Sequence, residues 1–119
     1  MPKKLVYICS PFRGDYERNT ENALKYSREA FKSGFIPITP HLYFPRFMDD
    51  TNSKERYMAM GAGIQLLEKC DELWAFGLEN PSEGMRYELE RATERGIPIL
   101  DGYEVMKILK SKRERGGTV

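Results

Sequence analysis

Short apolar runs alternate along the chain with longer stretches in which apolar residues recur every three or four positions. The runs at 5–9, 35–38, 73–76 and 97–100 predict four β-strands, because each is short and is bounded by residues that favour turns or helix starts. The second run contains Pro37, which cannot donate a hydrogen bond to a neighbouring strand. We therefore expect that strand near an edge of the sheet.

Between these runs, the spacing of apolar residues predicts four α-helices. The first covers about 15–34 and stops at a glycine, and the second begins at 52–55, where the residues resemble a helix start with a capping acid. The third covers 82–96 and the fourth about 103–112. In the first helix the helical spacing is carried by Thr20, Ala23, Leu24, Ser27, Ala30 and Phe31. We expect the buried stripe of the second helix to consist of Tyr57, Met60, Gly61, Ile64 and Leu67, and the inward stripe of the third to consist of Met85, Leu89, Ala92 and Gly96.

Strands that alternate with helices predict an α/β fold of three layers, a flavodoxin-like or Rossmann-like parallel sheet with helices on both faces. We expect one domain over 1–119, in which 113–119 form a flexible, solvated tail. Ligands of such sheets bind beyond the carboxyl ends of the strands, where the strand order reverses. The segments expected there are 10–15, 40–50 and 77–85.

Composition and charge limit the kinds of molecule that the chain is expected to bind. Lys and Arg number 19 against 18 Asp and Glu, a formal net charge of +1, so nothing favours nucleic acid or a membrane surface. No apolar run approaches the roughly 20 residues that span a bilayer, and the start has no signal-peptide pattern. The two cysteines, Cys9 and Cys70, are typical of small buried side chains in a reduced, cytoplasmic protein. With a single histidine we expect no metal site, and no cofactor.

The turn after the first strand holds the first group of candidate residues: Ser10, Phe12, Arg13 and Gly14. A hydroxyl, a guanidinium and a glycine turn lie between a strand and a helix start, where backbone N–H groups and the helix dipole favour anions. The alternative is an ordinary turn with a surface arginine. No Gly-Lys-Ser/Thr follows, so this is not a Walker loop.

The start of the third helix holds the second group. Ser82 begins this helix, Gly84 allows close approach of a ligand or a backbone, and Met85 starts the inward stripe. Glu88 lies about 60° from Met85 on the helical wheel and so borders the buried stripe. A carboxylate there can serve as a nucleophile or a ribose ligand, or can pair with a nearby arginine on a boundary face.

Tyr7 and His41 complete the candidates. Tyr7 and Cys9 alternate onto one face of the first strand, where most tyrosines merely pack. His41 opens the irregular segment 40–51, which is rich in aromatic residues. That segment either packs its own aromatic side chains on the core or forms a lid or wall over a flat ligand.

Taken together, these segments resemble the nucleoside 2-deoxyribosyltransferase superfamily, over about residues 4 to 100. The resemblance is to its small branch of 2'-deoxynucleoside 5'-phosphate N-hydrolases and, at least as much, to an uncharacterised bacterial and phage branch. The first matching element is Val-Tyr-Ile-Cys-Ser-Pro-Phe-Arg-Gly at 6–14. The second is the strand at 70–76 followed by Pro-Ser-Glu-Gly-Met-Arg-Tyr-Glu-Leu-Glu-Arg-Ala at 81–92.

The resemblance implies cleavage of the N-glycosidic bond of a (deoxy)nucleoside 5'-monophosphate. By the same resemblance Glu88 matches the nucleophile and Tyr7 the residue that orients it. The residues that match the loops holding the 5'-phosphate are Ser10, Arg13, Gly14 and Ser82. Phe12 and the aromatic residues of 40–47 would cover the base. The resemblance also implies a homo-oligomer, commonly a dimer, with its sites near the subunit interface.

One departure from the family pattern matters. The family has an aspartate on the helix before the third strand, where it contacts the sugar and helps the base to leave. Here the stretch 61–66 has no acid, and Gln65 cannot donate a proton as a carboxylic acid can. Two alternatives therefore stand beside the enzyme: a non-catalytic domain that binds or senses a nucleotide, and a structural or interaction domain in which Glu88 would be exposed and Arg13 unpaired.

Overall fold

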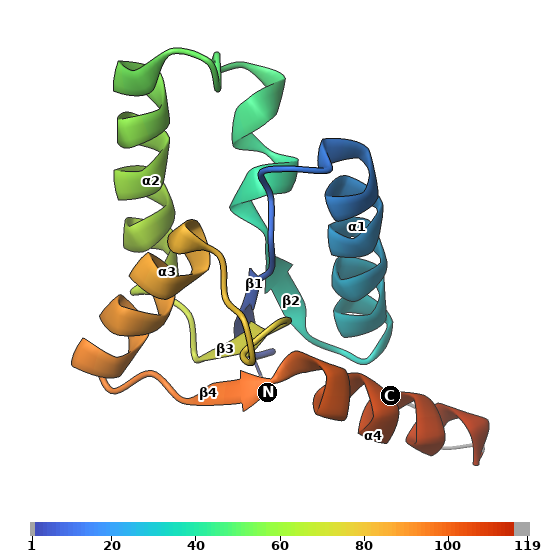
Figure 1. Ribbon diagram of the computed structural model, residues 1–119. Coiled ribbons are helices and arrows are strands. Elements are labelled where there is room, and N and C mark those ends of the chain that lie inside the picture. Colours follow the sequence, from blue (N-terminus) through green and yellow to red (C-terminus); the bar gives the residue numbers. More distant parts are fainter. Residues whose placement is uncertain (1, 116–119) are drawn as a thin grey trace.

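The computed structural model describes residues 2–115 and contains one four-stranded sheet (Figure 1). Its strands are β1 (Leu5–Cys9), β2 (Ile36–Ile38), β3 (Glu72–Ala75) and β4 (Ile99–Asp101). All neighbouring strands are parallel, in the order β2-β1-β3-β4. The predicted parallel sheet is confirmed. The strand that contains Pro37 is at an edge, as its missing N–H requires.

Each strand leads into a helix whose first turn is capped by a short polar side chain. The helices are α1 (Tyr16–Lys32), α2 (Ser53–Leu67), α3 (Glu83–Glu94) and α4 (Gly102–Glu114). Their caps accept a hydrogen bond from a backbone N–H of the first turn, which would otherwise lack a partner. These caps are Asp15, Asn52, Ser82 and Asp101. Within residues 2–115, none of the helices has the length and apolar character to span a membrane.

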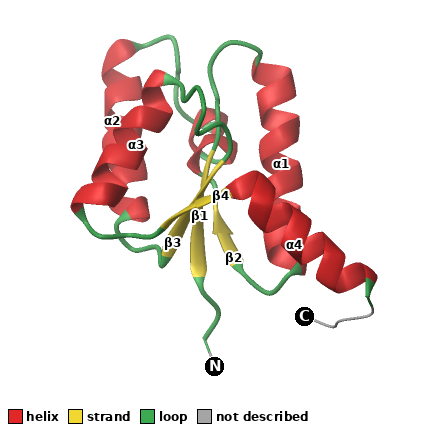
Figure 2. Ribbon diagram, turned by 60° about the horizontal axis from the view of Figure 1, so that its bottom comes forward, coloured by secondary structure: helices red, strands yellow, loops and turns green. Residues whose placement is uncertain are grey.

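The helices form two layers, one on each face of the sheet (Figure 2). Helices α2 and α3 cover the face on which Tyr7 and Cys9 of β1 lie, together with Leu73 of β3. Helices α1 and α4 cover the other face, where Trp74 and Phe76 form the core. The expected three-layer α/β fold and the alternation along β1 are thereby confirmed. Cys9 and Cys70 are buried free thiols, as expected.

Close packing against Phe76 explains a glycine at the start of α4. A Cβ atom on Gly102 would lie 2.5 Å from two atoms of the Phe76 ring, closer than two such atoms can approach. The same ring stacks on Tyr26 of α1, with centroids 3.7 Å apart. Phe76 thus joins α1 and α4 beneath the sheet, and only glycine leaves room for it.

The last helix differs from its expected bounds. We expected 113–119 to form a tail, but Arg113 and Glu114 belong to α4. Arg113 donates a hydrogen bond to Ser33 Oγ at 2.8 Å and forms an ion pair with Glu29, so it ties α4 to α1. Contacts between residues so far apart in the sequence cannot be predicted from the local spacing of apolar residues. The rest of the expected tail, 116–119, lies outside the described residues.

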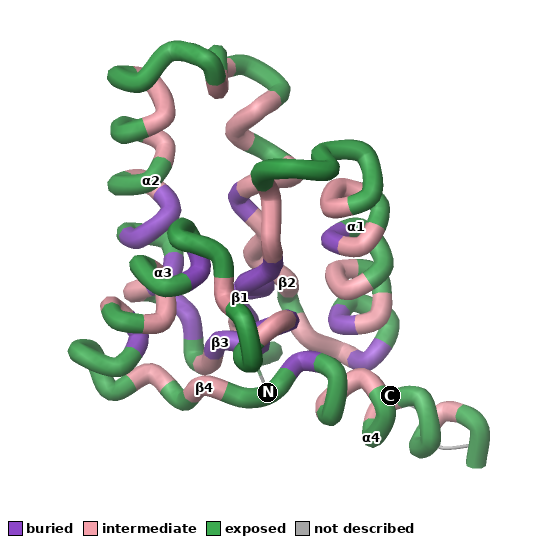
Figure 3. Tube along the Cα trace, viewed as in Figure 1, coloured by how far each residue is buried: buried purple, intermediate pink, exposed green. Residues whose placement is uncertain are grey.

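Several positions with helical apolar spacing prove to be exposed. Leu24 and Phe31 of α1 are exposed by 54% and 66%, and Tyr57 of α2 by 79%. Met60 is also exposed, because the N-terminal part of α2 extends past the sheet and no layer covers it (Figure 3). Gly96 does not continue the buried stripe of α3. It follows the helix with a φ of 68°, a left-handed conformation that favours glycine.

The strand order reverses between β1 and β3. From β1 the chain crosses to β2 at one side, and later returns to β3 on the other side of β1. The loops that follow β1 and β3 therefore diverge and leave a crevice at the carboxyl ends of these two strands. This is the place in the fold where a ligand site is expected.

Candidate active site

A cavity of about 620 Å³ opens at this reversal point. Its walls come from the end of β1, the loop that follows it, the segment after β2, the N-terminal part of α2 and the first turns of α3. Every site residue predicted from the sequence lines the cavity except Gly14. Those that line it are Tyr7, Ser10, Phe12, Arg13, His41, Ser82, Gly84, Met85 and Glu88.

At the floor of the cavity, Tyr7 and Glu88 form a short hydrogen bond. The fully buried Tyr7 donates its hydroxyl to Oε2 of Glu88, which keeps part of its surface open to the cavity. Burial raises the pKa of Glu88 to about 7, and the hydrogen bond from Tyr7 opposes this shift. Burial, followed by the nearby carboxylate, raises the pKa of Tyr7 well above its usual value. Tyr7 therefore remains a hydrogen-bond donor at neutral pH.

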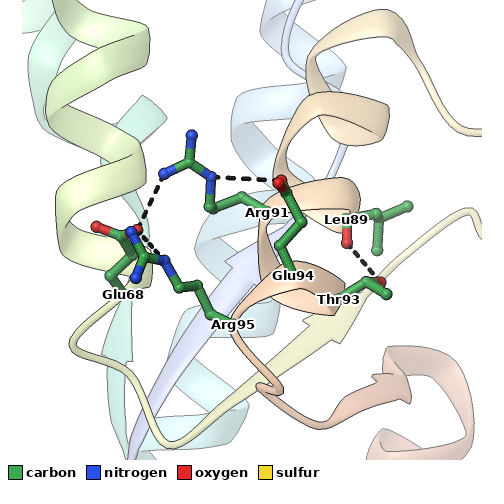
Figure 4. Close-up of polar contacts among 6 residues, drawn as sticks. All are labelled: Glu68, Leu89, Arg91, Thr93, Glu94 and Arg95. Carbon is green, nitrogen blue, oxygen red and sulfur yellow. Dashed lines mark hydrogen bonds and ion pairs between the residues drawn. The ribbon is translucent and has the colours of Figure 1, made fainter.

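The packing of α2 and α3 fixes this pair. A Cβ atom on Gly63 of α2 would lie 3.5 Å from the Tyr7 hydroxyl, so α2 packs closely over it. Figure 4 shows Arg91 of α3 and Arg95, which follows this helix, converging on Glu68, which directly follows α2. The two guanidinium groups lie 3.0 and 2.7 Å from Glu68 Oε2. Because Arg91 is nearly one turn beyond Glu88, this ion-pair cluster holds the helix that carries Glu88.

An asparagine that the sequence analysis did not identify holds the loop after β1. The side-chain amide of Asn19 donates to the carbonyl oxygens of Phe12 and Arg13, both at 3.2 Å. Gly14 has a φ of 103°, which the turn into α1 requires. Gly14 thus shapes the loop without lining the cavity, while Arg13 lines it from an exposed position.

Beside the loop, Ser10 and His41 join two segments that are distant in the sequence. Ser10 Oγ lies 3.1 Å from His41 Nε2, and Ser10 is buried. Burial lowers the pKa of His41 to about 4, so its ring is neutral at pH 7. The imidazole stacks on Phe12 with centroids 5.5 Å apart. This arrangement presents a flat, neutral surface to the cavity.

The first turn of α3 forms another part of the wall. Ser82 Oγ accepts the N–H of Met85 at 3.3 Å and so acts as the helix cap. A Cβ atom on Gly84 would meet nothing within 4 Å, so the backbone is open to a ligand there. The buried Met85 closes the wall below it. Free N–H groups at a helix start are suited to an anion.

In the segment after β2, aromatic side chains both pack against one another and form part of the cavity wall. Its aromatic residues Tyr43, Phe44 and Phe47 pack edge to face on one another, with centroids 4.9 to 5.8 Å apart. Phe44 also lines the cavity. At the end of the segment, Asp50 accepts the hydroxyl of Tyr16 at 2.6 Å, which connects this wall to the start of α1.

The part of the wall formed by α2 was not predicted from the sequence. Arg56 and Tyr57 line the cavity, as does Asp50 just before this helix. Apolar and small residues occur on every side of α2, so its spacing did not show which side faces a ligand. Within residues 2–115, no cluster of three or more metal-binding side chains is present.

Comparisons with known proteins agree with this architecture. A family model described as a domain of unknown function (DUF7768) matches residues 4–101. Among solved structures, the chain is similar to a 2-deoxyribosyltransferase from the psychrotolerant bacterium Bacillus psychrosaccharolyticus, with 16% sequence identity and a TM-score of 0.66. The match covers 80% of this chain and 69% of that one. No curated protein matches. The structural similarity establishes a shared fold.

Proposed function

We propose that this chain, which belongs to the DUF7768 family of domains, cleaves the N-glycosidic bond of a (deoxy)nucleoside 5'-monophosphate with Glu88 as the nucleophile. The observation that carries the proposal is the Glu88 carboxylate, which faces the cavity while Tyr7 holds one of its oxygens. The fold shared with a 2-deoxyribosyltransferase supports the same class of chemistry.

The reaction would proceed in two displacements at C1' of the sugar. In the first, an oxygen of ionised Glu88 bonds to C1' while the bond from C1' to the base nitrogen breaks. The electron pair leaves with the base, which takes a proton from water. In the second, water bonds to C1', the ester bond to Glu88 breaks, and the proton that water loses passes to solvent. Tyr7 holds the carboxylate through Oε2 and would keep it oriented for the attack.

The other residues of the wall would bind and orient the nucleotide. Arg13 and the first turn of α3, with Ser82 at its cap, offer charge and N–H donors to the 5'-phosphate. Phe12, His41 and Phe44 offer flat surfaces to the base. Binding energy from the phosphate, remote from the reacting carbon, would then help to position C1' over Glu88.

We also propose that the chain forms a homo-oligomer through α2. The large side chains Tyr57, Met58, Met60 and Leu66 of this helix are exposed in a single chain. A helix that is apolar on all sides is usually covered on all sides. Because the same helix lines the cavity, a partner seated on it would lie beside the site.

A nucleotide-binding or sensing domain without turnover is the second candidate. The observation that favours it is the absence of any acid among the α2 residues that line the cavity, where the family resemblance leads one to expect an aspartate. A purely structural role predicts an exposed Glu88 and an unpaired Arg13. Arg13 forms no ion pair within residues 2–115, but Glu88 is hydrogen-bonded to a buried tyrosine, so this role fits less well.

The proposal is tested by incubating the protein with ribo- and deoxyribonucleoside 5'-monophosphates and measuring free base. The wild type should release base, and Glu88→Gln should not. Glu90→Gln is the matched control, since Glu90 is exposed on the same helix and does not line the cavity. Equal release by wild type and Glu88→Gln would exclude the nucleophile. Binding without release by either protein would favour the sensor.

A further inference from the structure

The cavity contains an arginine that the proposed reaction does not use. Arg56 lines it from α2, seven residues before the Gly63 that packs over the Tyr7 hydroxyl. At 1.5 Å of rise per residue, Arg56 is about 10 Å farther along the cavity wall than the reaction centre. The cavity therefore extends well past the place where C1' would bind.

The guanidinium of Arg56 is available to a ligand. It is partly buried, and it forms no ion pair with any carboxylate of residues 2–115. Its neighbours on the cavity face of α2, Tyr57 and Met60, cannot neutralise it. Three carboxylates also line the cavity, those of Asp50, Glu83 and Glu88, and none of them forms an ion pair with Arg56. An arginine without an ion pair has its N–H donors free for an anion, and arginine binds phosphate through two parallel hydrogen bonds.

The positions of the two arginines that line the cavity indicate how many phosphate groups the ligand has. Arg13 approaches from the loop after β1, and Arg56 from α2 on another side. A sugar and its first phosphate would occupy the floor and the first turn of α3. Between Gly63 and Arg56, about two turns of α2 line the cavity beyond this position. Further phosphates, joined in series to the first, would fit along these turns.

From these positions we propose that Arg56 binds the outer phosphates of a nucleoside 5'-diphosphate or 5'-triphosphate, so that the site accepts a nucleotide with a phosphate chain. This inference rests on the proposed function for the location of the sugar. It assigns Arg56 a role in selecting the ligand and leaves the reaction at Glu88 unchanged.

Equilibrium binding to Glu88→Gln tests the inference without turnover. Isothermal titration would compare the 5'-mono-, di- and triphosphates of each of the four deoxynucleosides at one ionic strength. We expect the di- or triphosphate to bind at least about tenfold more tightly than the monophosphate, the size of one charge-assisted contact. Adding Arg56→Gln should remove this difference and change the monophosphate affinity less than about twofold.

The control is Arg46→Gln, since Arg46 is exposed in the segment after β2 and does not line the cavity. It should preserve the difference among the three phosphates, and circular dichroism would verify that each variant is folded. Equal affinities for the three phosphates would overturn the inference, as would an equal loss for all three in Arg56→Gln, or disappearance of the difference in Arg46→Gln.

Failure of this inference is distinguishable from failure of the proposed function. Release of base from monophosphates by the wild type, with no preference for longer phosphate chains, would leave the enzyme standing and remove the role of Arg56. A preference that depends on Arg56, with no release of base from any nucleotide, would leave the binding site and remove the enzyme. Absence of any nucleotide binding would overturn both.

Discussion

Glu88 has properties that suit a nucleophile at neutral pH. Burial disfavours its ionised form, and the hydrogen bond from Tyr7 favours it, with a net pKa of about 7. A carboxylate with such a pKa is a stronger base than an ordinary glutamate, yet it is substantially ionised at pH 7. The short hydrogen bond from Tyr7 to Oε2 holds the carboxylate in place.

The pH dependence of the reaction follows from this ionisation. Because attack needs the carboxylate, kcat/KM should rise with pH and level off above about 7. Tyr7→Phe removes a hydrogen bond that favours the ionised form, so the midpoint should move to higher pH and kcat/KM at pH 7 should fall about 10- to 100-fold. A pH–rate profile of both proteins measures this, and an unchanged midpoint in Tyr7→Phe would contradict the role of Tyr7.

The same pKa predicts how stability depends on pH. A glutamate whose pKa is raised in the folded state disfavours folding as pH rises from 4.5, the usual value, through about 7. The wild type should lose up to about 3 kcal/mol of unfolding free energy over this range relative to Glu88→Gln. Urea denaturation at pH 5 and pH 8 measures the difference. Parallel behaviour of the two proteins would show that the carboxylate is not desolvated.

At the scale of residues, the sequence predicted most of the residues that surround the candidate site and missed others for identifiable reasons. Glu88 and Tyr7 follow from helical and strand periodicity together with the family resemblance. Asn19 and Arg56 do not, because a side chain that caps a loop and one that lines a cavity look like any polar residue of a helix surface. Only the packing of segments that are distant in the sequence distinguishes Asn19 and Arg56 from other polar residues on helix surfaces.

At the scale of elements, the ion-pair cluster of Glu68 with Arg91 and Arg95 positions α3 against α2 (Figure 4). The hydrogen bond from Arg91, together with the two positive charges, lowers the pKa of Glu68 below its usual 4.5. Its contribution to stability is therefore present above pH 4.5 and is lost as pH falls through the lowered pKa.

Glu68→Gln should consequently lower the melting temperature at pH 7, and the wild type and the variant should converge as pH is taken below 4.5. Thermal unfolding by circular dichroism at several pH values provides the measurement. Glu79→Gln, at an exposed glutamate after β3, is the control and should leave the melting temperature unchanged. A constant difference between wild type and Glu68→Gln at all pH values would argue against the ion pairs.

Element types were predicted better than their exposed faces. The four strands and four helices occur where the apolar pattern indicates, with bounds that shift by a few residues. Helical periodicity placed Tyr57 and Met60 on a buried side of the helix, but both are exposed. Periodicity identifies an apolar side of a helix and does not tell whether another element covers it. Arg113 was missed because a contact with Glu29 on another helix decides that α4 continues to Glu114.

At the scale of the whole molecule, the order β2-β1-β3-β4 gathers segments from both halves of the chain around one cavity. The alternation of strands and helices predicted the parallel sheet and its helical layers. It did not predict that α2 would extend beyond the sheet, because the length of a helix relative to its neighbours depends on the segment that enters it. That extension both deepens the cavity and exposes an apolar helix.

The exposed side of α2 leads to a prediction about assembly. Met58 is exposed by 65% in a single chain and does not line the cavity. If α2 carries the interface, Met58→Glu should convert the oligomer to monomers, because an unpaired charge would be buried. Light scattering coupled to gel filtration measures the mass. A monomeric wild type, or an unchanged oligomer in Met58→Glu, would contradict this interface.

The central claim is that Glu88 forms a covalent bond with the sugar during turnover. Acid quenching with excess nucleotide, followed by peptide mass spectrometry, tests it directly. The peptide bearing Glu88 should gain the mass of the sugar phosphate without its base. Release of base with the sugar on a different peptide, or with no sugar on any peptide, would contradict it.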